Sequence, residues 1–240
     1  PVLYVDRLLF GIAEGALFSA NFTFAADIIP TQRRTQGLAL FGIAGLSALL
    51  VNPLTDVWGL SPPQLPMFFV CVGGLISLSL IFLMLIQAGD KPSDPQSIAW
   101  SQVLAILNHP RLWGPWMATI SFAAMVSTFF AFATVSAEAR GLSTPSTLWF
   151  TYVIGAVGVR LVGGHWADRY GPHNFIAPSI GMYVVAAIVM MEAQSLASLA
   201  CVGLCAGVAH GMCFPLLTSQ VVSRVSDDVR GFALALYTGL

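Results

Sequence analysis

Charged side chains are scarce in this sequence. Asp, Glu, Lys and Arg make up 9% of its 240 residues. A soluble domain carries about 25% charged residues, so a soluble globular fold is excluded. A disordered chain is excluded because 57% of the residues are hydrophobic. The formal net charge is −1, which leaves no basic surface for nucleic-acid phosphates. No nucleic-acid partner is therefore expected.

Cysteine and the short motifs of catalytic sites are also scarce. Four cysteines lie inside apolar runs, without the CxxC spacing of a redox or zinc site: Cys71, Cys201, Cys205 and Cys213. We expect them to be small packing residues. No His/Cys cluster, phosphate-binding glycine loop or GxSxG motif is present. The sequence therefore predicts no metal site, no cofactor and no enzyme.

Long apolar runs separate the few charges. Six uncharged gaps are each long enough for the ~20 apolar residues that cross a bilayer as a helix. We place eight segments near residues 4–28, 37–55, 67–87, 112–135, 146–166, 175–191, 196–221 and 231–240. The runs do not alternate in polarity, as the strands of a membrane barrel would. The predicted fold class is an all-α polytopic membrane protein surrounded by lipid bilayer.

The distribution of Lys and Arg predicts which side of the membrane each connection faces. If the first connection is cytoplasmic, eight of these residues lie at inner turns and their flanks: Arg33, Arg34, Lys91, Arg111, Arg160, Arg169, Arg224 and Arg230. The outer side keeps only Arg7 and Arg140. This bias obeys the positive-inside rule, so we expect the first connection to be cytoplasmic.

An internal repeat predicts the architecture. GIAEG at residues 11–15 resembles GLCAG at 203–207, and GLALFGIAGL at 37–46 matches five of ten positions of GFALALYTGL at 231–240. The offsets of 192 and 194 place the first segment opposite the seventh, so the repeat unit is six helices. Tandem six-helix halves are a transporter architecture. We expect this sequence to be part of a longer chain, incomplete at both ends.

The repeat divides the sequence into three parts. Residues 1–87 would hold helices four to six of the N-terminal half, and residues 111–240 helices seven to the start of eleven. Residues 88–110 form the longest polar stretch and would be a cytoplasmic linker. Within this linker, residues 97–107 are expected to form a short surface helix.

The first segment carries ionisable groups on one face. Helical spacing places the following residues on that face: Arg7, Gly11, Glu14, Phe18 and Asn21. An ionisable residue in a membrane helix costs ~2.5–3.5 kcal/mol even on the lenient insertion scale, so it normally faces a cavity or a partner. We expect a substrate or proton path with a titrating Glu14. The alternative is that Arg7 lies at the outer interface and Glu14 pairs structurally with another helix.

Two further polar residues are candidates for the transport path. His210 lies near mid-membrane, within the glycine series Gly203, Gly207 and Gly211, which predicts close helix packing. Its imidazole is either a proton carrier or ligand, or a hydrogen-bonded packing residue. Asn52 begins the stretch NPLTD, which is expected to break a helix near the outer side and to form a gate.

Two polar turns are expected on the cytoplasmic side. In the first, residues 26–37, Pro30 stops a helix, Arg33 and Arg34 hold the turn inside, and Gly37 begins close packing. The second, GGHWADRYG at residues 163–171, offers Asp168 as a cap for the N-terminus of a neighbouring helix. We interpret the second as a conformational latch; the alternative is a plain surface turn.

Three motifs carry a resemblance to a known family. RLLFGIAEG, from Arg7, resembles the Arg-containing fourth-helix motif of the major facilitator superfamily, and DIIPTQRRTQG, from Asp27, resembles its fourth-to-fifth loop signature. GHWADRYG resembles the G-x-x-x-D-R-x-G motif between its helices eight and nine. The motif residues are Asp27, Arg33, Arg34, Gly37, Gly164, Asp168, Arg169, Gly171 and Arg230. The resemblance covers all 240 residues in the family's order.

The resemblance implies a transporter. It implies two six-helix bundles related by a pseudo-twofold axis, alternating access, a small-molecule substrate, a functional monomer and a multi-pass location in the plasma or inner membrane. It also implies that Asp168 meets the start of helix five near residues 35–37. HGMCFP, from His210, is similar to bacterial efflux permeases. Helix five keeps only Pro53 of the G-P-x-x-G-G stretch of proton antiporters, so proton coupling is left open.

Two other functions stay open from the residues alone. A membrane scaffold or sensor would keep the fold without transporting a solute. An intramembrane enzyme would need converging catalytic groups, and only Arg7, Glu14 and His210 are available for that role. Solute flux through the full-length protein separates the transporter from both.

Overall fold

The computed structural model describes residues 2–85, 100–142, 145–226 and 229–239. Within these ranges the chain forms helices and short connections, without a strand. The long helices are α1 (Val2–Ile28), α5 (Leu65–Met84), α7 (Trp113–Ala139), α8 (Pro145–Tyr170), α9 (His173–Met191) and α10 (Leu196–Val222). The short helices are α6 (Trp100–Leu107) and α11 (Arg230–Gly239).

The second predicted segment is helical but interrupted. It consists of η1 (Thr31–Arg33), α2 (Arg34–Phe41), α3 (Ile43–Ser47), η2 (Ala48–Leu50) and α4 (Val51–Val57). Counting this stretch as one, seven helical stretches are long and apolar enough to cross a membrane. The all-α polytopic fold class is therefore confirmed. The eighth expected segment is the ten-residue α11.

The structure corrects two predicted interruptions of the helices, one at residues 52–56 and one at residues 163–171. NPLTD does not break a helix, because residues 51–57 form α4 and Pro53 lies in its first turn, where proline removes no helical hydrogen bond. The interruptions lie earlier, at Gly42 and at η2. The second predicted turn is also shorter than expected, since α8 continues to Tyr170. Gly171, with a φ of 92°, and Pro172 make the reversal into α9.

One arginine was assigned to the wrong place. Arg160 was counted among the inner turns and flanks, but it lies inside α8, ten residues before the end of that helix, and its side chain is 2% exposed. At a rise of 1.5 Å per residue it is about 15 Å from the helix end, in the interior of a membrane-spanning segment. The expected inner count therefore falls from eight to seven, and the bias keeps its direction.

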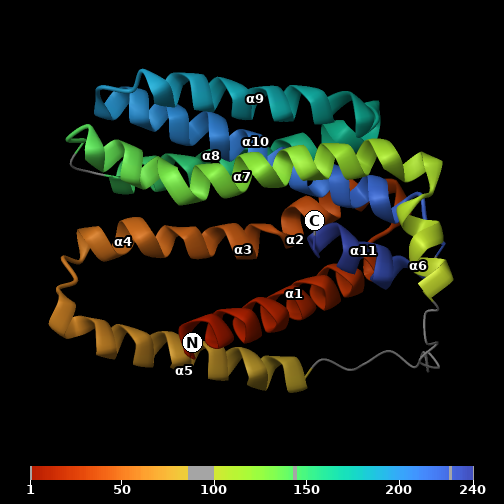
Figure 1. Cartoon of the computed structure of the whole chain (residues 1–240), viewed down its shortest axis with the longest axis horizontal. Coiled ribbons are helices and arrows are strands. Elements are labelled where there is room, and N and C mark those ends of the chain that lie inside the picture. The colour runs from red at the N-terminus through yellow and green to blue at the C-terminus, as the bar shows by residue number, and fades with distance from the viewer. Residues whose placement is uncertain (1, 86–99, 143–144, 227–228, 240) are drawn as a thin grey trace.

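The helices after residue 110 pack around the contact between α8 and α10 (Figure 1). Three glycines of α10 allow this contact. Cβ atoms added at Gly203, Gly207 and Gly211 would strike the backbone carbonyls of Leu148, Tyr152 and Ala156, respectively. The predicted small-residue seam therefore exists, and it brings two helix backbones into direct contact. Helix α9 packs against the other side of α10.

Helices from before and after the predicted linker meet at one end of the molecule (Figure 1). Helix α1 packs against α11, and α2 packs against α8 and α10. The turns from α1 into α2 and from α8 into α9, the end of α10 and the start of α11 lie at this same end. Helix α5 buries none of its residues. The described part of the predicted surface helix is α6; residues 97–99 lie outside the described ranges.

The orientation in the membrane gives a first testable prediction. In a variant without the four native cysteines, single cysteines placed at the exposed Gln64 and Gln194 should react with a membrane-impermeant thiol reagent added outside. A cysteine at the exposed Asn174, in the first turn of α9, should react only after the cells are opened. Reaction of the residue 174 variant in intact cells would reverse the sidedness that the positive-inside rule gives.

Candidate functional site

A cavity of about 470 Å³ lies between α1, α7, α10 and α11. Its wall comes from helices on both sides of the predicted linker. The lining residues are Gly11, Glu14, Gly15, Phe18, Thr119, Phe122, Ala123, Val126, Ser127, His210, Phe214, Tyr237 and Thr238. The wall is mainly apolar and aromatic with a few polar groups, which is typical of a pocket for a small organic molecule.

Two of the five predicted path residues line this cavity. Glu14 reaches it from α1 and His210 from α10, although they are 196 residues apart in the sequence, by the difference 210 − 14. Arg7 and Asn21 are exposed on α1 and are not part of the lining. Asn52 belongs to α4, and its side chain lies outside the described part of the structure. Of the predicted face of α1, only Gly11, Glu14 and Phe18 line the cavity.

Two tyrosine hydroxyls hold the His210 ring. The Tyr152 hydroxyl lies 2.5 Å and the Tyr183 hydroxyl 3.3 Å from Nδ1 of His210, and the two hydroxyls are 3.2 Å apart. The Phe122 ring packs edge-on against the imidazole, with centroids 5.4 Å apart. His210 is thus both a hydrogen-bonded packing residue and a cavity residue. This arrangement fixes which edge of the ring a solute would meet.

Sequence reasoning missed both tyrosines. They come from α8 and α9, and each stands alone in an apolar run, so no spacing links them to His210. The α8–α10 seam is what brings Tyr152 to the imidazole. The only signal in the sequence is that a tyrosine hydroxyl inside a membrane helix requires a hydrogen-bond partner.

Aromatic rings gather beside the cavity where the two parts of the chain meet. The Phe214 ring contacts Phe18, Phe22 and Tyr237, with centroid distances of 5.5, 5.0 and 5.8 Å. Phe22 in turn meets Phe41 of α2 edge-on at 5.2 Å. These five rings, which we call the aromatic floor, join α1, α2, α10 and α11. Along α1, the rings of the floor lie between Glu14 and the helix end on the expected cytoplasmic side.

Asp168 caps the start of α2, beyond the aromatic floor. Its Oδ1 accepts a hydrogen bond from Thr35 N at 3.0 Å, and its Oδ2 accepts one from Gln36 N at 2.9 Å. These two N–H groups belong to the first turn of the helix, where no intrahelical partner is available and the helix dipole is positive. Asp168 therefore meets helix five at the position that the family resemblance implied.

Two neighbouring contacts reinforce this cap. A Cβ atom added at Gly164 would lie 2.8 Å from Gln36 Cα, so α8 and α2 touch backbone to backbone. Arg230, at the start of α11, donates a hydrogen bond to Asp27 Oδ1 at 2.5 Å, near the end of α1. Each contact joins an element before the predicted linker to one after it. Together with the cap they hold the expected cytoplasmic end closed.

The remaining motif residues support these turns rather than the cavity. Arg33 is exposed in η1, while Arg34 is buried at the start of α2. Gly37 lies against Ile29, whose Cγ2 would be 2.6 Å from an added Cβ. Arg169 is exposed, with its guanidinium carbon 5.4 Å from the centre of the Tyr170 ring.

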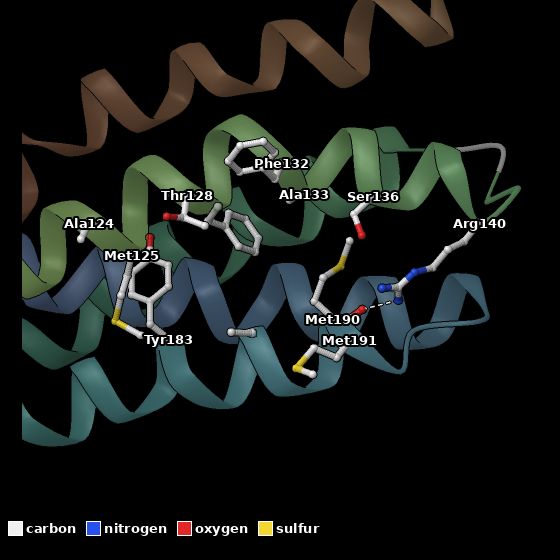
Figure 2. Close-up of a pocket in the computed structure, with 12 residues that line it drawn as sticks. Ala124, Met125, Thr128, Phe132, Ala133, Ser136, Arg140, Tyr183, Met190 and Met191 are labelled. Atoms are coloured by element: carbon white, nitrogen blue, oxygen red, sulfur yellow. Dashed lines mark hydrogen bonds between the residues drawn. The ribbon is translucent and has the colours of Figure 1, made fainter.

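A second cavity, of about 390 Å³, lies between α7 and α9 (Figure 2). Its wall includes Phe129, Phe132 and Met190, and Arg140 lies at its outer end. The Arg140 guanidinium donates hydrogen bonds to the carbonyls of Met190 and Ala193, and the one to Met190 is drawn as a dashed line in Figure 2. A cation at these last carbonyls stabilises the helix terminus. Arg140 thus caps α9, and this cavity lies apart from the contact between the two parts of the chain.

The comparison with known proteins decides the family, since the model of the Major Facilitator Superfamily matches residues 1–240. The chain belongs to this superfamily. An uncharacterized MFS-type transporter of Salmonella typhimurium is 23% identical over 239 residues, which are 99% of this chain and 60% of that protein. The multidrug resistance protein MdtG of Salmonella choleraesuis is 23% identical over 238 residues, 94% of this chain and 58% of its own length.

MdtG of Escherichia coli O1:K1 is 22% identical, again over 94% of this chain and 57% of its own length. The chain therefore spans about 60% or less of the length of these curated relatives. No solved structure matches it significantly. Membership of this superfamily, with seven membrane-spanning helical stretches, makes the chain a multi-pass membrane protein and points to a transporter rather than an enzyme.

Proposed function

We propose that the full-length protein is a secondary transporter that moves a small organic solute out of the cell by alternating access. One observation carries this proposal: the cavity lined by Glu14 and His210 lies between the two parts of the chain and is closed at one end only by contacts between those parts. Breaking these contacts would open the other side without unfolding either part. That is the geometry which alternating access requires.

The cavity supports an organic solute and the relatives support efflux. Four Phe and Tyr rings contribute to the lining, and Glu14 and His210 add a carboxylate and an imidazole. Such a wall favours a compound with an apolar body and few polar groups. Two of the relatives carry the name multidrug resistance protein. We also propose, as the family resemblance implies, that the full-length transporter functions as a monomer in the plasma or inner membrane.

Proton coupling through Glu14 is the second part of the proposal. Glu14 faces the cavity, and it forms no ion pair with any side chain in the described ranges. A carboxylate in that position can bind a proton from one side and release it on the other as the cavity changes access. Glutamine keeps the shape of the side chain and carries no titratable proton.

We therefore expect Glu14→Gln to lose the response of flux to a pH gradient. The full-length protein in liposomes should move a fluorescent lipophilic dye faster when protons run in the opposite direction. In the variant, the ratio of fluxes with and without the gradient should fall to unity. Glu192→Gln is the matched control, because Glu192 is exposed at the end of α9 and should keep the wild-type ratio.

The outcomes separate the candidate functions. A normal gradient response in Glu14→Gln would remove this carboxylate from coupling and leave transport standing. Absence of flux for every dye and organic solute by correctly inserted wild-type protein would favour the scaffold or sensor. Catalytic turnover of a solute without its movement would favour the enzyme.

A further inference from the structure

Arg160 is a buried cation without a counter-ion among the described side chains. Its residue is 2% exposed, and its Nε donates a hydrogen bond to the carbonyl of Gly211 at 3.0 Å. Nη1 is fully buried and has no hydrogen-bond partner. The ion pair that the described residues contain is between Asp27 and Arg230, so no described carboxylate lies within 4.0 Å of Arg160. Such a charge is costly inside a membrane protein and is normally retained for a function.

The surroundings of the guanidinium leave one of its edges for an anion. Nε is used by Gly211 O, whereas Nη1 lies on the far edge of the planar group, and that edge can hold both oxygens of a carboxylate. The Phe214 ring lies beside the guanidinium, with its centroid 6.0 Å from Cζ. Because Phe214 also lines the cavity, Arg160 lies directly behind the aromatic floor.

The element that covers Nη1 comes from the other part of the chain. Gly42, between α2 and α3, lies so close that an added Cβ would strike Nη1 of Arg160. Helix α2 also carries the N–H groups that Asp168 caps. Gly42 directly follows this helix, so a movement of α2 away from α8 would displace Gly42 and break the cap together. Separation of α2 from α8 would therefore uncover the guanidinium on the expected cytoplasmic side.

We propose that Arg160 binds the carboxylate of an aromatic organic acid when the cavity is open to the cytoplasm, and that Gly42 covers the site when that side closes. This inference deepens the proposed function and rests on it for the opening movement. The guanidinium would fix the acid group, and the aromatic floor would contact the ring. An acid bound at Arg160 loses its site when α2 returns, which favours its release toward the outer side.

Equilibrium binding of a matched pair of compounds tests this site. Salicylate and salicylamide have the same ring and hydroxyl group. Salicylate carries a negatively charged carboxylate where salicylamide carries a neutral amide. Equilibrium dialysis of each radiolabelled compound against the purified full-length protein in nanodiscs should show salicylate binding about tenfold more tightly, because only the carboxylate gains a charge-assisted pair. Arg160→Gln should abolish this preference. Arg111→Gln is the control, since Arg111 is an exposed arginine just before α7 and this variant should leave the preference unchanged.

Equal binding of the two compounds by the wild type, or an undiminished preference in Arg160→Gln, would overturn the proposal. If the glutamine variant does not purify as a monodisperse protein, Arg160→Lys carries the test. Lysine offers a point charge instead of a planar fork, so the preference should fall without vanishing, and an unchanged preference counts against the site. Dialysis needs no gradient. A preference without flux therefore rejects transport alone, and flux without a preference rejects the anion site alone.

Discussion

Replacement of Gly207 by valine is expected to prevent α8 and α10 from packing and to cost most of the folded protein. A Cβ atom at this position would overlap the carbonyl oxygen of Tyr152 and would lie 2.8 Å from its carbonyl carbon. The obstacle is backbone, which no rotamer change can move. Overpacking of a well-packed interior typically costs about 1–3 kcal/mol, and a rigid backbone obstacle is at or above the upper end of this range.

Thermal unfolding of the purified full-length protein in detergent should show this loss, together with a several-fold fall in monodisperse yield. Gly158→Val is the matched control, because Gly158 is an exposed glycine of α8 with no atom within 4 Å of an added Cβ. Valine has a higher helix propensity than glycine, so the control should be neutral or slightly stabilising. A Gly207→Val protein as stable as this control would show that the seam is not a close backbone contact in the membrane.

The same seam links stability to the site. Tyr152 lies in the seam opposite Gly207 and its hydroxyl lies 2.5 Å from Nδ1 of His210. A displacement of α8 therefore moves a partner of His210 as well as the helix. The sequence predicted the seam from three glycines at a spacing of four residues, but not the hydroxyl beside the imidazole. Helical spacing reports which residues share a face, whereas a contact between α8 and α10 depends on how two helices are aligned.

The charges explain which parts of the fold were predictable. Uncharged gaps placed the membrane helices, because a charge in the bilayer core is costly and therefore rare. The same rule misassigned Arg160, since it treats every arginine as the flank of a helix. The same rule predicted that the segment at 146–166 ends four residues before α8 does. Polar side chains such as Asp168 mark the edge of the membrane, whereas the backbone hydrogen bonds of the helix continue beyond it. Pro53 was misinterpreted for a related reason: proline stops a helix only beyond its first turn.

The candidate site was predictable one residue at a time. Glu14 and His210 stood out because each is an ionisable group in an apolar helix, and both line the cavity. Arg7 stood out for the same reason and lies outside the lining, because the helical stripe continues past the cavity toward the outer end of α1. Whether a polar residue on a helix face meets a cavity is set by the neighbouring helices, which a single segment does not encode.

Asp168→Asn is expected to shift the protein toward the state that is open to the cytoplasm. Both carboxylate oxygens accept hydrogen bonds, at 3.0 and 2.9 Å, from the first-turn N–H groups of Thr35 and Gln36. Asparagine keeps one acceptor oxygen and places an NH₂ group against the other N–H, and it removes the negative charge. A charge at a helix N-terminus is worth about 0.3–1 kcal/mol and up to ~2 kcal/mol when it is partly buried.

This cap exists only while α8 touches α2, so its loss raises the free energy of the closed state and leaves the open state unchanged. A loss of ~1.4 kcal/mol would change the ratio of the two states by about tenfold. Distances between spin labels at the exposed Gln32 and Asn174, one on each part of the chain, should report it as growth of a longer-distance population. Asp6→Asn, an exposed aspartate near the start of α1, is the matched control.

The same shift connects the cap to the Arg160 site. If Gly42 covers the guanidinium in the closed state, the apparent affinity for salicylate is the intrinsic affinity multiplied by the open fraction. Asp168→Asn should therefore tighten salicylate binding by the same factor by which it raises the open fraction in the distance measurement. Flux should nevertheless fall, because transport needs return to the closed state. An unshifted distance distribution in Asp168→Asn would mean that the carboxylate only satisfies two helix N–H groups, and that other contacts between α2 and α8 determine which side is closed.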